Sequence, residues 1–155
     1  MKDYLYRYRC KVNRVIDGDT IDVDIDLGFD CWLHDERVRI DGIDCPETRT
    51  RDLVEKQFGF ITKRRVEELL PVGEFTYLIS SAYFRRGGFG RVIGDFLVND
   101  TWLSEILIKE HHAIYWLEND RDQMEANHLR NRTYLLDGDY LTEEDKYRIQ
   151  DLMTA

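Results

Sequence analysis

Isoleucine, valine and leucine alternate with aspartate over residues 21–27 (IDVDIDL), and this two-residue period constrains the fold more than any other feature of the chain. Side chains on a β-strand point to opposite faces in turn. The segment therefore predicts a strand with one buried and one wet face, as in an antiparallel sheet. Residues 6–16 (YRYRCKVNRVI) also alternate apolar with basic side chains. Because the DGD sequence at 17–19 supplies turn chemistry between the two segments, the pair predicts a hairpin.

The order of the remaining elements suggests a small barrel. A helix is predicted over residues 53–70, where Pro71 closes it, and further helices are expected at 101–112 and 120–130. The other predicted strands are at 36–43 (ERVRIDGI), 74–80 (EFTYLIS) and 90–98 (GRVIGDFLV). Five strands interrupted by a helix after the third are compatible with a Greek-key barrel of the OB type. From the pattern alone, an α+β fold with an OB-type five-stranded β-barrel and three to four α-helices is one prediction among several.

The C-terminal segment is predicted to extend a single domain. A chain of 155 residues is long enough for one domain with a real core and short for two. We expect that domain at 1–132 and an acidic extension at 133–155, made of a linker near Leu135 and a short helix. Thr142 would cap this helix, and the carboxylates at 143–145 suit its N-terminal dipole.

The charge balance limits the modes of binding open to the chain. Its formal net charge is −9, and its pI is near 4.9. Binding through a broad basic face depends on neutralising many phosphates, so this acidity argues against a protein that coats nucleic acid. The sequence is still compatible with a local basic cleft, because basic residues gather at 62–65 (TKRR) and 84–91 (FRRGGFGR).

Several features predict a cytoplasmic protein with reduced thiols. No apolar run reaches the roughly eighteen residues that a membrane span needs. The N-terminal residues MKDYLYRYRC lack the apolar core and cleavage site of a secretory signal. The cysteines, Cys10, Cys31 and Cys45, are odd in number and have no C-x-x-C spacing, which argues against a disulfide framework and a structural zinc site.

Two turns place carboxylates beside glycine or proline at predicted strand ends: VIDGDT at 15–20 and DGIDCPET at 41–48. Asp19 and Asp44, with Glu47 nearby, would supply the oxygen ligands that a hard divalent cation prefers. Carboxylates that approach one another without a cation repel, so a cation is the natural compensation. The alternative is that each Asp-Gly pair simply forms a hairpin turn.

Two arginines flank these turns in the sequence. Arg39 precedes Asp44 on the third predicted strand, and Arg91 follows the glycine-rich loop. A guanidinium is always charged and can hold a phosphate through two donors, so the pair suggests a phosphodiester site beside a metal. The alternative is that exposed arginines simply solvate a strand.

Three separated segments resemble the staphylococcal nuclease (thermonuclease) family in order and spacing. They are VIDGDTIDVDI at 15–25, RVRIDGIDCPET at 37–48, and FGRVIGDFLVNDTWLSEILIKEHHAIYW at 89–116. The resemblance covers roughly Tyr6 to Trp116, and more loosely the helix to Arg130. It implies an OB-type five-stranded barrel with helices packed against it.

The resemblance also implies a calcium site. Asp19 and Asp44 would bind Ca²⁺ through their carboxylates, and Cys45 through its backbone carbonyl. Glu47 corresponds to the family glutamate that orients or deprotonates the attacking water. Asp17, by contrast, is expected to hold its turn. Cys45 replaces the usual threonine, which matters little if only the carbonyl is used.

The remaining implied residues contact the substrate. Arg39 and Arg91 match the arginines that grip the scissile phosphate and stabilise charge in the transition state. Phe89 stands where the family often has tyrosine, which removes a hydroxyl near the phosphate. Tyr115 or Trp116 could stack on a base, although a core role is the alternative for either.

The resemblance implies a calcium-dependent nuclease, a hydrolase that cleaves DNA, RNA or both and leaves 3′-phosphate ends. The sequence does not determine the oligomeric state, and a monomer is expected. The loop after Glu47 is shortened to TRTRDL, which predicts weaker or altered substrate capture. The acidic extension has no family role, and His111 and His112 are interpreted as structural. The rival interpretation is a non-catalytic OB-type module that binds nucleic acid or a protein, because one fold serves both roles.

Overall fold

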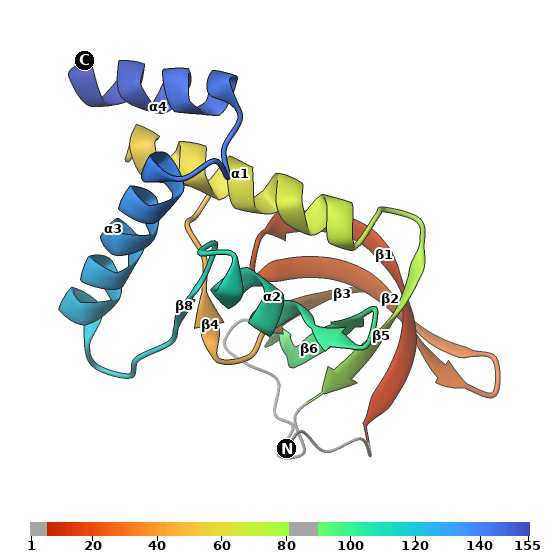
Figure 1. Cartoon of the computed structure of the whole chain (residues 1–155). Coiled ribbons are helices and arrows are strands. Elements are labelled where there is room, and N and C mark those ends of the chain that lie inside the picture. The colour runs from red at the N-terminus through yellow and green to blue at the C-terminus, as the bar shows by residue number, and fades with distance from the viewer. Residues whose placement is uncertain (1–5, 81–89) are drawn as a thin grey trace.

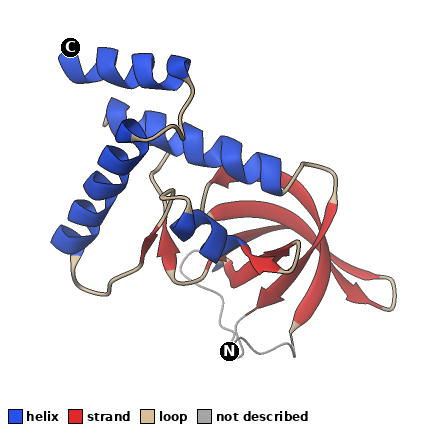
Figure 2. Cartoon of the chain, in the orientation of Figure 1, coloured by secondary structure: helices blue, strands red, loops and turns tan. Residues whose placement is uncertain are grey.

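Strands β1 (Arg7–Asp17), β2 (Thr20–Gly28) and β3 (Cys31–Ile40) form an antiparallel meander in the computed structural model, which describes residues 6–80 and 90–155. The sheet continues from β1 through β5 (Phe75–Ser80) and β6 (Val92–Val98) to β7 (Thr101–Trp102). A parallel pairing of β3 with β6 closes the sheet into a five-stranded barrel (Figures 1 and 2). The predicted OB-type barrel is therefore confirmed.

The barrel interior is filled by the residues that the alternating pattern predicts. The inward side chains of β2 are buried and those of β1 meet them across the antiparallel register. The buried apolar residues of these two strands are Cys10, Val12, Val15, Ile21, Val23 and Ile25. The outward Asp22 differs from expectation, because Arg14 and Arg37 cover it with nitrogen–oxygen distances of 3.1 and 2.9 Å. Asp22 is thus nearly buried on the face that was predicted to be wet.

Helix α1 (Leu53–Leu69) lies along the barrel and ends before Pro71, as predicted. The side chain of Asp52 accepts hydrogen bonds from the backbone N–H groups of Val54 and Glu55, which caps the first turn. Short strands β4 (Ile43–Asp44) and β8 (Ile114–Tyr115) form a separate antiparallel pair beside the barrel.

Three predicted boundaries are wrong. The third strand begins at Cys31 and ends at Ile40, so the predicted segment 36–43 continues into the separate strand β4. Helix α2 (Leu103–Lys109) starts only after the two residues of β7. Helix α3 (Arg121–Asp137) continues past the predicted end at Arg130, and the predicted linker near Leu135 is instead helical. Burial of Leu135 against other helices favours this longer helix over its weak sequence pattern.

Helix α4 (Glu143–Thr154) packs over α1 at the end of the chain (Figure 1). The Thr142 hydroxyl accepts a hydrogen bond from the Asp145 N–H at 3.1 Å, so the predicted N-cap is confirmed. An ion pair joins Arg64 of α1 to Asp145. A second apolar cluster lies between these helices, formed by Phe58, Ile61, Leu135, Leu141 and Ile149. Residues 133–155 are thus tied to the barrel through α1.

All three cysteines are free, with Cys10 and Cys45 buried and Cys31 exposed. The helices in the described part of the chain are too short and too polar to cross a bilayer.

Candidate active site

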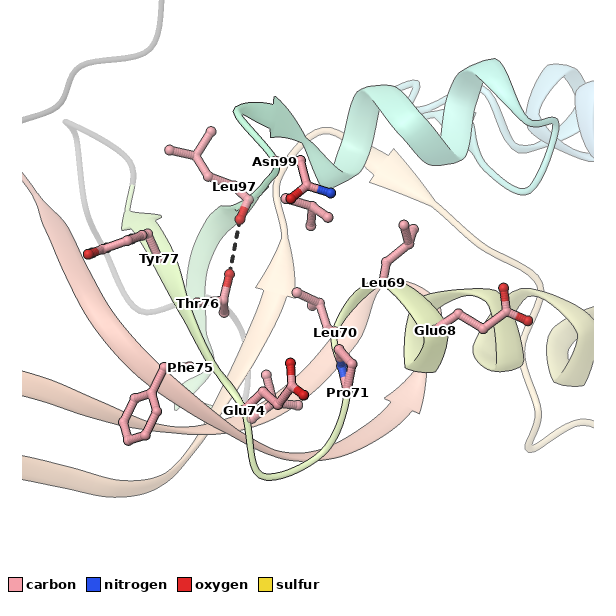
Figure 3. A pocket seen from close by; sticks show the side chains of 12 residues that line it. Glu68, Leu69, Leu70, Pro71, Glu74, Phe75, Thr76, Tyr77, Leu97 and Asn99 are labelled. Carbon is pink, nitrogen blue, oxygen red and sulfur yellow. Dashed lines mark hydrogen bonds between the residues drawn. The ribbon is translucent and has the colours of Figure 1, made fainter.

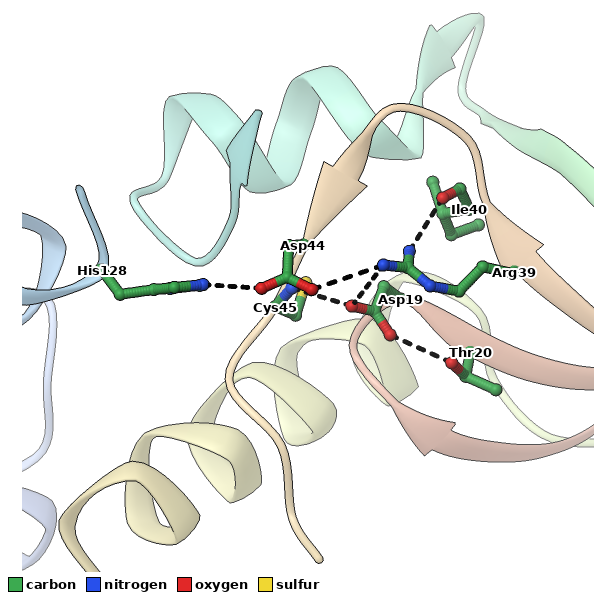
Figure 4. Close-up of polar contacts among 7 residues, drawn as sticks. All are labelled: Asp19, Thr20, Arg39, Ile40, Asp44, Cys45 and His128. Carbon is green, nitrogen blue, oxygen red and sulfur yellow. Dashed lines mark hydrogen bonds and ion pairs between the residues drawn. The ribbon is translucent and has the colours of Figure 1, made fainter. Parts of the chain in front are cut away.

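Asp19 and Asp44 converge on Arg39, although they come from three different elements (Figure 4). Asp19 lies in the turn between β1 and β2, Arg39 lies near the end of β3, and Asp44 lies on β4. The Nη2 atom of Arg39 is 3.5 Å from Oδ2 of Asp19 and 3.4 Å from Oδ1 of Asp44. Its Nη1 atom donates to the Ile40 carbonyl at 2.9 Å, which fixes the plane of the guanidinium.

Backbone hydrogen bonds hold the two turns against one another. Oδ2 of Asp19 accepts from the Cys45 N–H at 2.8 Å, and Oδ1 accepts from the Thr20 hydroxyl at 3.0 Å. The Ile40 N–H donates to the Asp19 carbonyl at 2.9 Å. Asp19 is only 6% exposed, so its carboxylate is held by donors and not by solvent.

Asp17 binds a segment 31 positions away, whereas the prediction gave it a role within its own turn. Its Oδ1 atom accepts from the Thr48 N–H at 3.0 Å and from the Thr48 hydroxyl at 2.6 Å. Since Thr48 follows Glu47 directly, these bonds also fix the segment that carries Glu47.

Glycines on both sides allow close contact between helix α1 and the two turns. A Cβ atom on Gly59 would lie 2.5 Å from the carbonyl oxygen of Glu47. A Cβ atom on Gly18, in the β1–β2 turn, would lie 2.3 Å from Cγ2 of Thr62. Glycine at these two positions therefore lets the turns approach the helix.

Burial and mutual repulsion shape the electrostatics of the site. Burial raises the pKa of Asp19, and the charge of Asp44 adds to that effect while Arg39 opposes it. Burial also raises the pKa of Glu47, with further contributions from the neighbouring aspartates. The pKa of the Cys45 thiol is raised well above its ordinary value, chiefly by burial. The thiol is therefore protonated, which makes it a poor nucleophile and a poor metal ligand.

His128 of α3 also contacts the site, and sequence reasoning missed it. Its Nε2 atom lies 2.8 Å from Oδ2 of Asp44, on the opposite side of that carboxylate from Arg39 (Figure 4). The two residues are 84 positions apart. No local motif marks His128, and only the packing of α3 beside β8 brings it to Asp44.

An open groove of about 1020 Å³ runs from Asp44 and Glu47 along α3. Trp116 lines this groove and is 55% exposed. Tyr115 is 64% exposed, and its partner in the β4–β8 pair is Ile43, next to Asp44. Because both side chains are largely exposed to solvent, neither belongs to the hydrophobic core of the described residues.

Arg91 and Phe89 lie at the edge of the described residues. Arg91 is half-buried and directly precedes β6, whose Val92 pairs with Val38. In this parallel register Arg39 pairs with Ile93, two positions after Arg91. Phe89 lies outside the described residues.

The donor chemistry of the site fits a hard divalent cation such as Ca²⁺. Two carboxylates meet here, and a cation would offset the burial of Asp19 and the nearby charge of Asp44, both of which raise the pKa of Asp19. Within the described residues, no three His, Cys, Asp or Glu side chains form a set that could hold a metal alone. Further ligands would therefore be carbonyls, such as that of Cys45, and water, both of which calcium accepts.

Comparison with known families agrees with this geometry. The family model described as staphylococcal nuclease homologue matches residues 37–133, which is more than half of the chain. The match includes Arg39, Asp44, Glu47 and Arg91, whereas Asp19 lies before it. No curated protein matches the chain.

Proposed function

The chain belongs to the staphylococcal nuclease homologue family, and we propose that it is a calcium-dependent nuclease that hydrolyses phosphodiester bonds in DNA, RNA or both. The observation that supports this most strongly is the convergence of Asp19 and Asp44 on Arg39, with Asp44 also lining an open groove beside Glu47. A carboxylate pair beside a guanidinium combines a place for a cation with a donor for a phosphate.

The proposed cation is held by the carboxylates of Asp19 and Asp44 and by the Cys45 carbonyl. When bound, Ca²⁺ would act as a Lewis acid that neutralises charge on a phosphate oxygen. It would also relieve the repulsion between two carboxylates that now share a single guanidinium.

Glu47 is proposed to orient the attacking water and accept its proton. Burial raises the pKa of Glu47 towards neutral pH, and a general base works best when its pKa is near the working pH. The water oxygen forms a bond to phosphorus, and the bond from phosphorus to the 5′ oxygen breaks. The 5′ oxygen takes up a proton from solvent, and the phosphate stays on the 3′ end.

Arg39 and Arg91 are proposed to stabilise the negative charge that builds on the phosphate oxygens during this attack. Two guanidinium groups fixed before the reaction cost no reorganisation as the charge develops. Arg39 already has its orientation set by the Ile40 carbonyl. Tyr115, exposed beside β4, is proposed to stack on a base of the substrate.

A cleavage assay tests this function. Single- and double-stranded DNA and RNA are incubated with the protein in calcium, and again after a chelator is added. We expect cleavage with 3′-phosphate ends in calcium alone, and a loss of at least about a hundredfold in Glu47→Gln. Nucleic acid binding by a folded protein that never cleaves would instead identify a non-catalytic module.

A further inference from the structure

The outward face of β1 and β5 carries cationic and aromatic side chains in direct contact. Along β1 the inward residues are buried, whereas Arg7, Arg9 and Lys11 are exposed. The neighbouring β5 presents Phe75 and Tyr77, which are 53% and 43% exposed. The register pairs Arg9 with Tyr77 and Lys11 with Phe75, so these residues form one continuous surface.

The arginines of this surface lie over aromatic rings. Cζ of Arg7 is 4.3 Å from the ring centroid of Tyr77, and Cζ of Arg9 is 4.7 Å from that of Phe75. Arg9 also lies 5.9 Å from the ring of Trp32 on β3. We name the surface formed by Arg7, Arg9, Trp32, Phe75 and Tyr77 the arginine–aromatic face.

The arginine–aromatic face is positive, although the chain as a whole is acidic. Asp26 pairs with Arg9 at 3.2 Å. The next aspartate on β2, Asp24, is held by Asn13, by His34 and by the Asp35 N–H. The two guanidinium groups of the face meet one carboxylate, Asp26, while Asp24 and Glu74 flank the face at its Lys11 end. A surface of this sign attracts phosphates locally.

A hollow of about 380 Å³ lies beside this face, between β5 and the end of α1 (Figure 3). Phe75 and Tyr77 lie at one side of it, and Leu70 and Leu97 contribute to its wall. The Thr76 hydroxyl donates to the Leu97 carbonyl at 3.0 Å, which ties β5 to β6 at this point. The rings of Phe75 and Tyr77 thus project from a strand that is fixed to its neighbour, on the side of β5 away from the hollow (Figure 3).

We propose that the arginine–aromatic face binds single-stranded nucleic acid. Proteins that bind single strands without sequence preference combine a cationic track for the backbone with aromatic rings on which bases stack. Arg7, Arg9 and Lys11 supply the track, while Phe75, Tyr77 and Trp32 supply the rings. A guanidinium over an aromatic ring is also a planar surface for a base. The bases of a duplex are already stacked and are not available to these rings.

This face is separate from the candidate active site. Arg9 and Asp17 lie on the same strand, and their positions along β1 differ by about 26 Å at roughly 3.3 Å per residue. Binding here requires neither a metal nor cleavage, so it can be measured when the catalytic proposal fails. If both proposals hold, the face captures a strand whose other end reaches Asp44 and Glu47.

The test is fluorescence anisotropy of a labelled single-stranded oligonucleotide of about 12 nucleotides, titrated with the full chain in a chelator. One variant is Phe75→Ser with Tyr77→Ser, and the other is Arg7→Gln with Arg9→Gln. The matched control is Tyr147→Ser with Arg148→Gln on α4, where the tyrosine is 71% exposed. We expect affinity to fall about tenfold or more in each face variant and to stay within about twofold in the control.

The arginine variant also carries a signature that a folding defect does not produce. Removing two phosphate contacts should reduce the slope of log affinity against log salt by about 1.4. Circular dichroism checks that each variant is folded. If the aromatic variant unfolds, the arginine variant still tests the proposal, because both of its substituted side chains are exposed. Unchanged affinity in the arginine variant overturns the proposal, as does equal binding of a blunt duplex. Wild-type dimerisation that both face variants abolish, seen by sedimentation, would assign the face to self-association and also overturn it.

Discussion

Replacing Gly59 by alanine should disturb the active site from the middle of α1. The new Cβ atom would lie 2.5 Å from the carbonyl oxygen of Glu47, 2.7 Å from its carbonyl carbon and 3.0 Å from the Thr48 nitrogen. These are backbone atoms, which cannot rotate away as a side chain can. Ordinary contact begins near 3.4 Å, so the segment must move by roughly 0.5–1 Å to restore normal packing.

Two opposing effects set the stability of Gly59→Ala. Alanine in a helix interior is favoured over glycine by about 1 kcal/mol. Overpacking of a closely fitted contact costs about 1–3 kcal/mol. The free energy of unfolding should therefore change little, or fall by up to about 2 kcal/mol. A displacement near 1 Å at a catalytic group, by contrast, can cost about a hundredfold in rate.

Cleavage rate and urea unfolding, measured side by side, test this expectation. The matched control is Glu67→Ala, an exposed position on the same helix, which should leave both unchanged. The reasoning predicts a large loss of rate with a small loss of stability. A Gly59→Ala protein that cleaves at the wild-type rate would refute the view that clearance at Gly59 positions Glu47.

Three further substitutions test other parts of the site. His128→Ala removes the donor to Asp44 and should weaken calcium binding about tenfold. His128→Gln keeps an N–H donor and should retain more calcium affinity. Calorimetry that finds wild-type calcium affinity in both variants would contradict this role. Cys45→Ala should retain most calcium-dependent cleavage, because the buried thiol is protonated; a loss as complete as in Glu47→Ala would show that the sulfur takes part. Burial lowers the pKa of His112 from its ordinary 6.5 to about 4. Between these two pH values the unfolded chain binds more protons than the folded chain, so the free energy of unfolding should fall as the pH drops from 6.5 towards 4. Urea unfolding of His112→Gln should show less of this loss, and equal pH dependence would count against a buried neutral imidazole.

The barrel was predictable because its strands carry local information. The alternation at residues 21–27 determines which side chains enter the core, and the DGD turn limits how the first two strands connect. The convergence of Asp19 and Asp44 was also predictable, since each belongs to a short segment with carboxylates beside glycine or proline at a strand end. Their common partner, Arg39, follows from the strand that leads into the second turn.

The features that sequence reasoning missed depend on distant contacts. His128 reaches Asp44 only because α3 packs beside β8, and no spacing within α3 records this. Asp22 matches the other aspartates of β2 in sequence, but Arg14 and Arg37 meet over it from the two neighbouring strands. The longer α3 is likewise stabilised by burial of Leu135 against α1 and α4, which a local pattern does not contain.

The central claim is that Asp19 and Asp44 form one cation site, and calcium titration by calorimetry tests it most directly. The full chain is titrated in parallel with Asp19→Asn and Asp44→Asn, which keep the side-chain shape and remove one charge each. The account predicts binding of one calcium ion per wild-type chain, and affinity about tenfold or more lower in each variant. Undiminished calcium binding in both variants, or no binding by the folded wild-type chain, would contradict it.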